Sequence, residues 1–348
     1  MGPIISSLNL LKFRGIQNLN LPNLAQINVL VGANNSGKTS ILEAVQLLAQ
    51  PEDIGTLMKV ALLRAPSKKR VEKVVEYFSP LFTKEMDHTG TALYSLNLEI
   101  TANGQLYSYE AGGDIGTLTD ITGRSSKTFS FTTKVTQKDK KPVYFTHRIQ
   151  NGTLESFEAS QEPLYQGAYL HSNASFYSSC VTFLSDSIIN EQKNEILNII
   201  QSFDPNVEDI SIVGEDIYLH NTVSGTLPLF SYGSGLQKAV LLTALLANSR
   251  NGVVLIDEID NTINISAFHE VFSWFVDACM RLNVQAFVTT HSEEALDAIL
   301  ESSDETEQEH IRIITLRKDS EQQKTTAVIR TGKTALLERS QFEMELRV

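Results

Sequence analysis

Gly32-Ala33-Asn34-Asn35-Ser36-Gly37-Lys38-Thr39 carries the two glycines, the lysine and the threonine of a phosphate-binding loop. The apolar run 27–31 before it predicts a strand, and the apolar positions of residues 38–49 recur along one face of a helix. A strand that turns into a helix in this way points backbone N–H groups and the positive end of the helix at one spot. We therefore expect a nucleoside triphosphate to bind at this turn.

Each residue type in the loop has a chemical reason. Gly32 and Gly37 let the backbone approach the phosphates, Lys38 should reach the β- and γ-phosphates, and Thr39 should be a ligand of Mg²⁺. Lys38 is also a candidate catalytic residue, because phosphoryl transfer depends on positioning and on stabilising charge. The candidate nucleotide contacts in the loop and the first helical turn are Asn34, Asn35, Ser36, Gly37, Lys38, Thr39 and Ser40.

A second signature consists of an apolar run, residues 252–256, followed by Asp257 and Glu258. Such a run is typical of a central strand in a parallel sheet, which is buried on both faces. The end of this strand would place Asp257 beside the phosphate loop, where it can hold Mg²⁺ through water. Glu258 would then orient or deprotonate the attacking water. A solvated turn is the alternative, and the phosphate loop upstream argues against it.

Two weaker motifs complete an ordered series. Gly233-Ser234-Gly235-Leu236-Gln237-Lys238 opens a helical stretch, and Ser234 lies 23 positions before Asp257. Residues 286–290 form another apolar strand, which ends at His291, 34 positions after Asp257. Either motif alone is weak, since a lone histidine near a core is usually structural. The complete series resembles that of the ABC-type ATPases, in the branch of the SMC, RecF and OLD-like proteins.

The resemblance implies a fold and an active site. The fold would be α/β, a P-loop NTPase of ABC-type head architecture, with a mostly parallel core sheet flanked by helices and an antiparallel β lobe. ATP and Mg²⁺ would be the cofactors. Ser234 and the N–H groups around Gly235 would close on the γ-phosphate bound by another protomer, giving composite sites in a head-to-tail dimer or its multiples. His291 would contact the γ-phosphate, and Arg14 would contact the nucleotide because Phe13-Arg14 matches the family's Phe-Arg element.

Within that branch, residues 4–50 and 190–348 are similar to small stand-alone bacterial ATPases of the OLD-like group. Leu236 departs from the second glycine of the signature motif, and residues 260–264 lack the histidine that the group carries there. The 57 residues after His291 are too few for the Toprim nuclease of full-length relatives, which needs on the order of a hundred.

The resemblance therefore implies the sensor or regulator subunit of a bacterial anti-phage system, similar in layout to PARIS or Septu. Such a subunit oligomerises and controls a separately encoded effector protein. A RecF-like DNA-repair ATPase that binds DNA directly is the alternative. The family's glutamine loop has no clear counterpart in the sequence.

The composition of the chain limits the kinds of partner that we expect it to bind. The chain has 348 residues and a net charge of −12 at pH 7, so its surface as a whole should bind DNA weakly at most. No stretch approaches the ~20 apolar residues of a membrane span, and no membrane contact is expected. Cys180 and Cys279 are far apart and are typical of buried thiols in a cytoplasmic protein.

We expect one ATPase head over residues 1–348, with the nucleotide-binding core at 1–50 and 190–348 and a β-rich lobe at 51–189. Apolar and polar side chains alternate within 92–109, which predicts an antiparallel sheet in the lobe. Asn103-Gly104 predicts a tight hairpin turn.

Three charged segments lie outside these motifs. Lys68-Lys69-Arg70 and the basic cluster at 138–141 are either a solvated helix face and hairpin tip or a contact for nucleic acid or a partner. Residues 293–309 carry eight acidic side chains and no basic ones. They are either a solvated helix end and loop or a docking surface for a basic partner.

Overall fold

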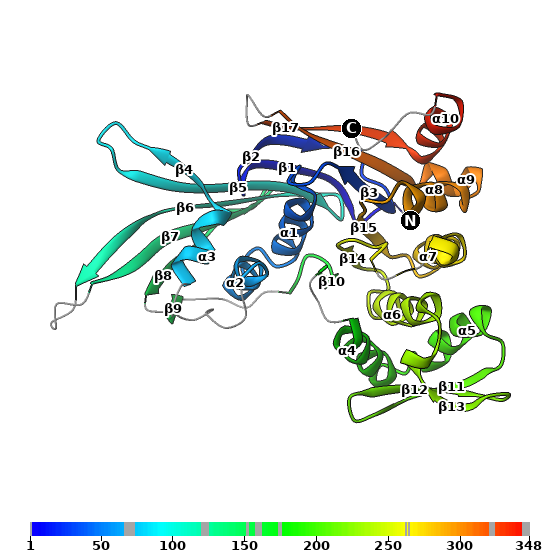
Figure 1. The fold of residues 1–348 in the computed structure, drawn as a ribbon. Coiled ribbons are helices and arrows are strands. Elements are labelled where there is room, and N and C mark those ends of the chain that lie inside the picture. Colours follow the sequence, from blue (N-terminus) through cyan, green and yellow to red (C-terminus); the bar gives the residue numbers. More distant parts are fainter. Residues whose placement is uncertain are drawn as a thin grey trace.

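The computed structural model describes residues 2–65, 74–119, 125–150, 153–156, 162–172, 176–261, 263, 265–319 and 324–342. Its centre is a six-stranded sheet in the order β10-β14-β15-β3-β16-β17 (Figure 1). All neighbouring strands are parallel except β16 and β17. The strands are β3 (Ile27–Gly32), β10 (Gly167–Leu170), β14 (Val253–Ile256), β15 (Gln285–Thr289), β16 (Ile311–Asp319) and β17 (Lys324–Thr331).

Helices cover both faces at the centre of this sheet, which is why β3, β14 and β15 are buried at every position. In β14, Val253 and Leu255 belong to the core that includes the apolar face of α1, whereas Val254 and Ile256 belong to the core beneath α6, α7 and α8. Successive side chains of a strand point to opposite faces, so a strand covered twice needs an apolar residue at every position. These helices are α1 (Lys38–Ala49), α6 (Ser234–Asn248), α7 (Phe268–Arg281) and α8 (Glu293–Glu301).

A second, antiparallel sheet extends away from the core in the order β2-β1-β5-β6-β7-β8-β9, with β4 on β5 (Figure 1). The predicted alternation is confirmed, since Leu96, Leu98 and Ile100 are buried. Asn103 and Gly104 form the expected turn, with φ of 50° and 73°. The strands are β1 (Ile5–Phe13), β2 (Ile16–Leu21), β4 (Thr83–Met86), β5 (Ala92–Ala102), β6 (Gln105–Thr119), β7 (Ser125–Gln137), β8 (Val143–Gln150) and β9 (Thr153–Ser156).

The sheets cut across the boundaries expected from the sequence. β1 and β2, placed in the core at 1–50, belong to the antiparallel sheet, and β1 pairs with β5. β10, placed in the lobe at 51–189, belongs to the core sheet and pairs with β14. The reason is a pairing between strands far apart in sequence, which local periodicity does not report. Helices α2 (Ile54–Leu62) and α3 (Val74–Phe78) and the short turn η2 (Ser79–Leu81) connect α1 to the lobe.

A third unit lies beside α6 at the lower right of Figure 1. It contains two helices and a three-stranded antiparallel sheet, and its apolar side chains are continuous with the core on the α6 side. The elements are α4 (Phe176–Ile189), α5 (Lys193–Phe203), β11 (Val207–Val213), β12 (Asp216–Asn221), β13 (Gly225–Pro228) and η3 (Leu229–Ser231). Cys180 in α4 and Cys279 in α7 are free and buried, as predicted, and burial raises the pKa of the Cys180 thiol to about 12.

The acidic segment 293–309 is partly neutralised within the chain. It forms α8 and α9 (Glu305–Glu309), which lie against α10 (Gly332–Phe342). Arg339 of α10 donates to Asp297 from Nε and Nη2, and its Nη2 lies 3.6 Å from Glu293 Oε2. Lys68-Lys69-Arg70, by contrast, lies outside the described residues.

Within the part of the chain that the structure describes, no helix is both long and apolar enough to cross a membrane.

Candidate functional site

The phosphate-binding loop connects β3 to α1 and needs its glycines for steric reasons. Gly32 has a φ of 139°, and a Cβ there would lie 2.4 Å from the carbonyl oxygen of Leu316 on β16. Gly37 has a φ of 108° and caps the N-terminus of α1. Asn34 and Asn35 are exposed at the turn, and Asn35 adopts a φ of 62°, a left-handed conformation that asparagine tolerates. Ser36 and Ser40 are buried beside the loop.

Lys38 folds back into the loop that precedes it. Its Nζ donates to the carbonyl oxygens of Gly32 at 2.7 Å and Ala33 at 3.0 Å. Burial lowers the pKa of Lys38 to about 8, and the charges of Asp257 and Glu258 oppose that shift. The ammonium therefore lies between the loop and the two carboxylates, where β- and γ-phosphates held by the loop would meet it.

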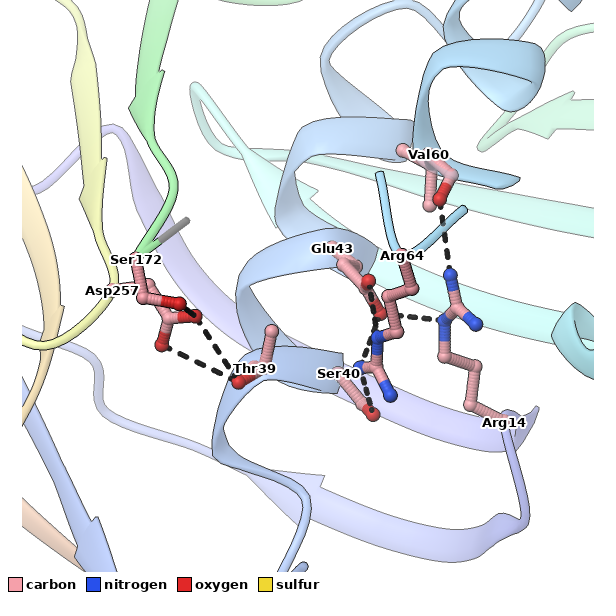
Figure 2. Close-up of polar contacts among 8 residues, drawn as sticks. All are labelled: Arg14, Thr39, Ser40, Glu43, Val60, Arg64, Ser172 and Asp257. Atoms are coloured by element: carbon pink, nitrogen blue, oxygen red, sulfur yellow. Dashed lines mark hydrogen bonds and ion pairs between the residues drawn. The ribbon is translucent and has the colours of Figure 1, made fainter. Parts of the chain in front are cut away.

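Hydroxyl oxygens from three segments surround the carboxylate of Asp257. Thr39 Oγ1 lies 3.3 Å from both Asp257 oxygens, Ser172 Oγ lies 3.2 Å from Oδ2, and Thr289 Oγ1 donates to Oδ1 at 2.7 Å. Figure 2 shows Thr39 and Ser172 approaching Asp257 from different elements. Hydroxyl and carboxylate oxygens are the ligands that Mg²⁺ prefers. The donor set thus fits the predicted Mg²⁺ site at Thr39 and Asp257.

Parallel strand pairing explains why these residues meet. Leu170 of β10 is opposite Ile256 of β14, and Ile256 is opposite Val288 of β15. The residues that follow each strand therefore meet at the carboxyl edge of the sheet, which is where open α/β sheets bind ligands.

Ser172 and His171 are site residues that the sequence did not reveal. His171 lies in the field of Asp257 and Glu258, and burial, the largest effect, lowers the pKa of its imidazole. Their strand, β10, has only four residues. The signal that could have found them is the apolar segment 168–170 followed by His-Ser, but only once that segment is known to pair with β14.

Glu258 sits at a sharp turn after β14. Its φ is 56°, and its backbone N–H donates to Thr289 Oγ1 at 2.8 Å. Thr289 therefore accepts from Glu258 while it donates to Asp257, so one hydroxyl fixes both acidic residues. A left-handed backbone at a bulky residue is uncommon and costs on the order of 1–3 kcal/mol, and such strained residues cluster at functional sites.

His291 follows β15 and belongs to the same edge. Burial, followed by the positive charge of Lys38, lowers the pKa of its imidazole, while Glu258, Asp260 and Asp257 act in the opposite direction. Next to it, Thr290 Oγ1 donates to Asp260 Oδ1 at 2.6 Å. The structure thus brings the predicted histidine within the electrostatic reach of the loop lysine and of the acidic pair.

Ser234 and Gly235 form the first turn of α6, with Gly233 as the N-cap. The contacts of this turn run to the segment after Glu258. A Cβ on Gly235 would lie 3.0 Å from Ala267 Cβ, and Lys238 Nζ donates to the carbonyl oxygen of Asn261 at 3.1 Å. Among the described residues, no hydrogen bond joins Ser234 or Gly235 to the phosphate loop of the same chain. The structure therefore does not bring these predicted contacts together with Lys38.

Arg14, a predicted nucleotide contact, lies in a buried ionic cluster on α1 (Figure 2). Its Nε is 2.5 Å from Glu43 Oε2, and its Nη2 donates to the carbonyl oxygen of Val60 at 3.0 Å. Burial, opposed by Glu43, lowers the pKa of Arg14 to about 10. Arg64 binds the other side of Glu43 and also donates from Nη2 to Ser40 Oγ at 3.2 Å. Its side chain is 45% exposed, against 7% for Arg14, so Arg64 presents the more accessible guanidinium beside the loop helix.

Comparisons with known proteins agree with this geometry. Residues 136–297 match a family model described as "AAA domain, putative AbiEii toxin, Type IV TA system", and residues 4–76 match one described as "AAA ATPase domain". An "ATP/GTP phosphatase" of Helicobacter pylori is 23% identical over 333 residues, which cover 85% of this chain and 87% of that protein.

Solved structures of SMC head domains share the fold. A head bound to the C-terminal winged-helix domain of ScpA has a TM-score of 0.53 and 14% identity, and the match covers 96% of this chain and all of that one. A head with an extended coiled coil, bound to the C-terminal domain of ScpA derived from Pyrococcus furiosus, has a TM-score of 0.51 and 11% identity, with 99% and 100% covered. The fold is that of an ABC-type P-loop head, as in the SMC heads. Both family models describe AAA domains, and the model over residues 4–76 describes an ATPase.

Proposed function

We propose that this chain binds and hydrolyses ATP with Mg²⁺ at the edge formed by the phosphate loop, Asp257, Glu258 and His291. The observation that carries the proposal is the approach of Thr39 Oγ1 to both oxygens of Asp257, 3.3 Å each, directly beside Lys38. Release of phosphate from Mg²⁺-ATP by the purified chain, with no release from Lys38→Ala, tests it.

The roles of the residues follow from their positions. The loop N–H groups and Lys38 hold the phosphates, and Thr39 with Asp257 would hold Mg²⁺, which neutralises charge on the phosphates when bound. Glu258 orients the attacking water, and His291 contacts the γ-phosphate. The "ATP/GTP phosphatase" name of the Helicobacter pylori relative supports nucleotide hydrolysis.

A complete site requires a second protomer. Ser234 and Gly235 offer a helix start whose contacts point to the segment after Glu258 and not to the phosphate loop of their own chain. A helix start provides N–H donors and a positive dipole end for an anion. In a head-to-tail dimer, or its multiples, this turn would close on the γ-phosphate bound by the neighbour.

The biological role that we propose is the sensor or regulator subunit of a bacterial anti-phage system, acting on a separately encoded effector. The match to a family described by a toxin and a type IV toxin–antitoxin system supports a two-component arrangement. Co-purification with the product of a neighbouring gene, together with loss of phage protection in Lys38→Ala, would support it. Normal protection by Lys38→Ala would exclude it.

Direct action on DNA, as in a RecF-like repair ATPase, is disfavoured by charge. With a net charge of −12, the chain should bind DNA weakly and lose that binding as salt rises, with a slope of about −0.9 in log–log units for each phosphate contact. Fluorescence anisotropy with a labelled duplex, at several salt concentrations and with and without ATP, measures this. Nanomolar, ATP-dependent DNA binding at physiological salt would favour the DNA-repair function over the anti-phage function.

The two arginines beside Glu43 should have separable effects. Arg14→Ala leaves a fully buried carboxylate with one partner fewer, so we expect the free energy of unfolding to fall by about 3 kcal/mol. Arg64→Ala should weaken ATP binding roughly threefold to tenfold, because its exposed guanidinium lies beside Ser40. Chemical denaturation and titration with a fluorescent ATP analogue measure the two. Unchanged stability with lost ATP binding in Arg14→Ala would instead make Arg14 the nucleotide contact.

A further inference from the structure

A cavity of about 310 Å³ lies between the turn that follows α1 and strands β6, β7 and β8. Residues 50–53 form one wall, and the hairpin that carries Lys140 and Lys141 forms another. Since α1 begins at Lys38 and rises about 1.5 Å per residue, this cavity is roughly 18 Å along the helix from the phosphate loop. It is a separate site, of the size that small-molecule ligands occupy.

The cavity contains a buried carboxylate oxygen that lacks a hydrogen-bond donor among the described residues. Glu52 Oε2 is buried and accepts no hydrogen bond from any described residue. The neighbouring Asp53 is different, since it accepts from the N–H groups of Gly55 at 2.8 Å and Thr56 at 3.1 Å and caps α2. Burial raises the pKa of Glu52, and Lys140 opposes the shift. A buried acceptor without a donor is costly, so a ligand with N–H groups would gain by supplying them.

The open side of the cavity is cationic. Lys140 and Lys141 are exposed, and Lys138 lies on the same hairpin. In the described part of the chain, none of the three lies within ion-pair distance of a carboxylate, although Lys140 acts on Glu52 through space. Glu162 also lines the cavity and is as exposed to water as the two lysines, so it offsets part of their positive charge but not all of it. The rim thus favours an anionic group on the ligand.

Much of the remaining lining is apolar or aromatic. Tyr107 of β6, Val135 of β7 and Leu164 line the cavity, and Gln137 adds an amide. A planar aromatic body packs well on such a surface. A ligand that fits this cavity therefore needs three groups. These are N–H donors toward Glu52, an aromatic ring near Tyr107 and a negative group near Lys140 and Lys141.

We propose that this cavity binds one nucleoside monophosphate unit with a guanine base. Guanine offers N1–H and its amino group side by side, so both can donate to the two oxygens of Glu52, whereas adenine offers only one amino group. The phosphate then lies against Lys140 and Lys141. The unit is either free GMP or the 5′-terminal nucleotide of a short strand, since both present the same chemistry.

Calorimetric titration of GMP into full-length Lys38→Ala protein tests the site without interference from the phosphate loop. We expect one GMP per chain and at least fivefold weaker binding of AMP and of guanosine. Glu52→Gln should lower the affinity about tenfold or more, the effect of losing a paired contact to a guanine edge. Lys140→Ala with Lys141→Ala should lower it severalfold and flatten its dependence on salt. The matched controls, Glu208→Gln and Lys127→Ala, change exposed residues that do not line the cavity and should leave binding unchanged.

A 5′-phosphorylated pentanucleotide that begins with guanine distinguishes free GMP from the 5′-terminal nucleotide of a strand as the ligand. Tighter binding than GMP assigns the site to a strand end, and equal or weaker binding assigns it to the free nucleotide. The proposal is overturned if GMP fails to bind at millimolar concentration, if AMP binds equally well, or if Glu52→Gln binds GMP like the parent. Because the lysine variants change only exposed side chains, loss of binding there cannot be ascribed to misfolding.

Discussion

Glu258→Gln should hydrolyse ATP about 10²–10⁴-fold more slowly than the parent, which is the usual loss on removing a positioned general base. The glutamine keeps the shape of the side chain, and the Glu258 backbone N–H still donates to Thr289. Lys38, Thr39 and Asp257 are untouched, so binding of Mg²⁺-ATP should stay within a few-fold of the parent. Single-turnover phosphate release and titration with a fluorescent ATP analogue measure the two quantities.

The control for this experiment is Glu301→Gln, which alters an exposed glutamate at the end of α8. It should leave both hydrolysis and binding unchanged. If Glu258→Gln hydrolyses ATP at the parental rate, another residue activates the water. His171 would then be examined first, because it lies in the field of the same two carboxylates.

Much of the site could be predicted because its motifs are local. The strand, loop and helix around Lys38 are contiguous, and the spacing of the two glycines, the lysine and the threonine identifies the loop without any distant contact. The placement of Asp257 and Glu258 required one more inference, that an apolar strand without alternation is central in a parallel sheet. The register of β14 with its neighbours confirms it.

What could not be predicted depends on pairings over long distances in the chain. Ser172 contacts Asp257 across 85 positions, and Thr289 contacts it across 32. The same limit produced the wrong boundaries, because β1 joins the lobe only through its pairing with β5, and β10 joins the core only through β14. No local periodicity records such a pairing. The partner of a charged residue is equally hidden in the sequence, as the ion pair between Arg14 and Glu43 shows.

The composite-site proposal makes a prediction about mixtures of inactive subunits. Lys38→Ala and Ser234→Ala should each be nearly inactive alone, since each damages every site of its own oligomer. In a mixed dimer, the loop of the Ser234→Ala subunit faces the intact Ser234 of the Lys38→Ala subunit, so one site is complete. Random mixing should therefore restore about a quarter of parental ATPase activity, because half of the dimers are mixed and each has one working site of two.

The matched control places both substitutions in one subunit and mixes it with the parent. Each site of such a mixed dimer carries one damaged residue, so purified mixed dimers, selected with two affinity tags, should be inactive. The same two substitutions thus give opposite outcomes according to whether they lie on one chain or on two, which a defect of folding or stability cannot produce. No recovery in verified mixed dimers of the two single variants would mean that Ser234 serves its own chain, and the contacts of α6 with the segment after Glu258 would then be structural only.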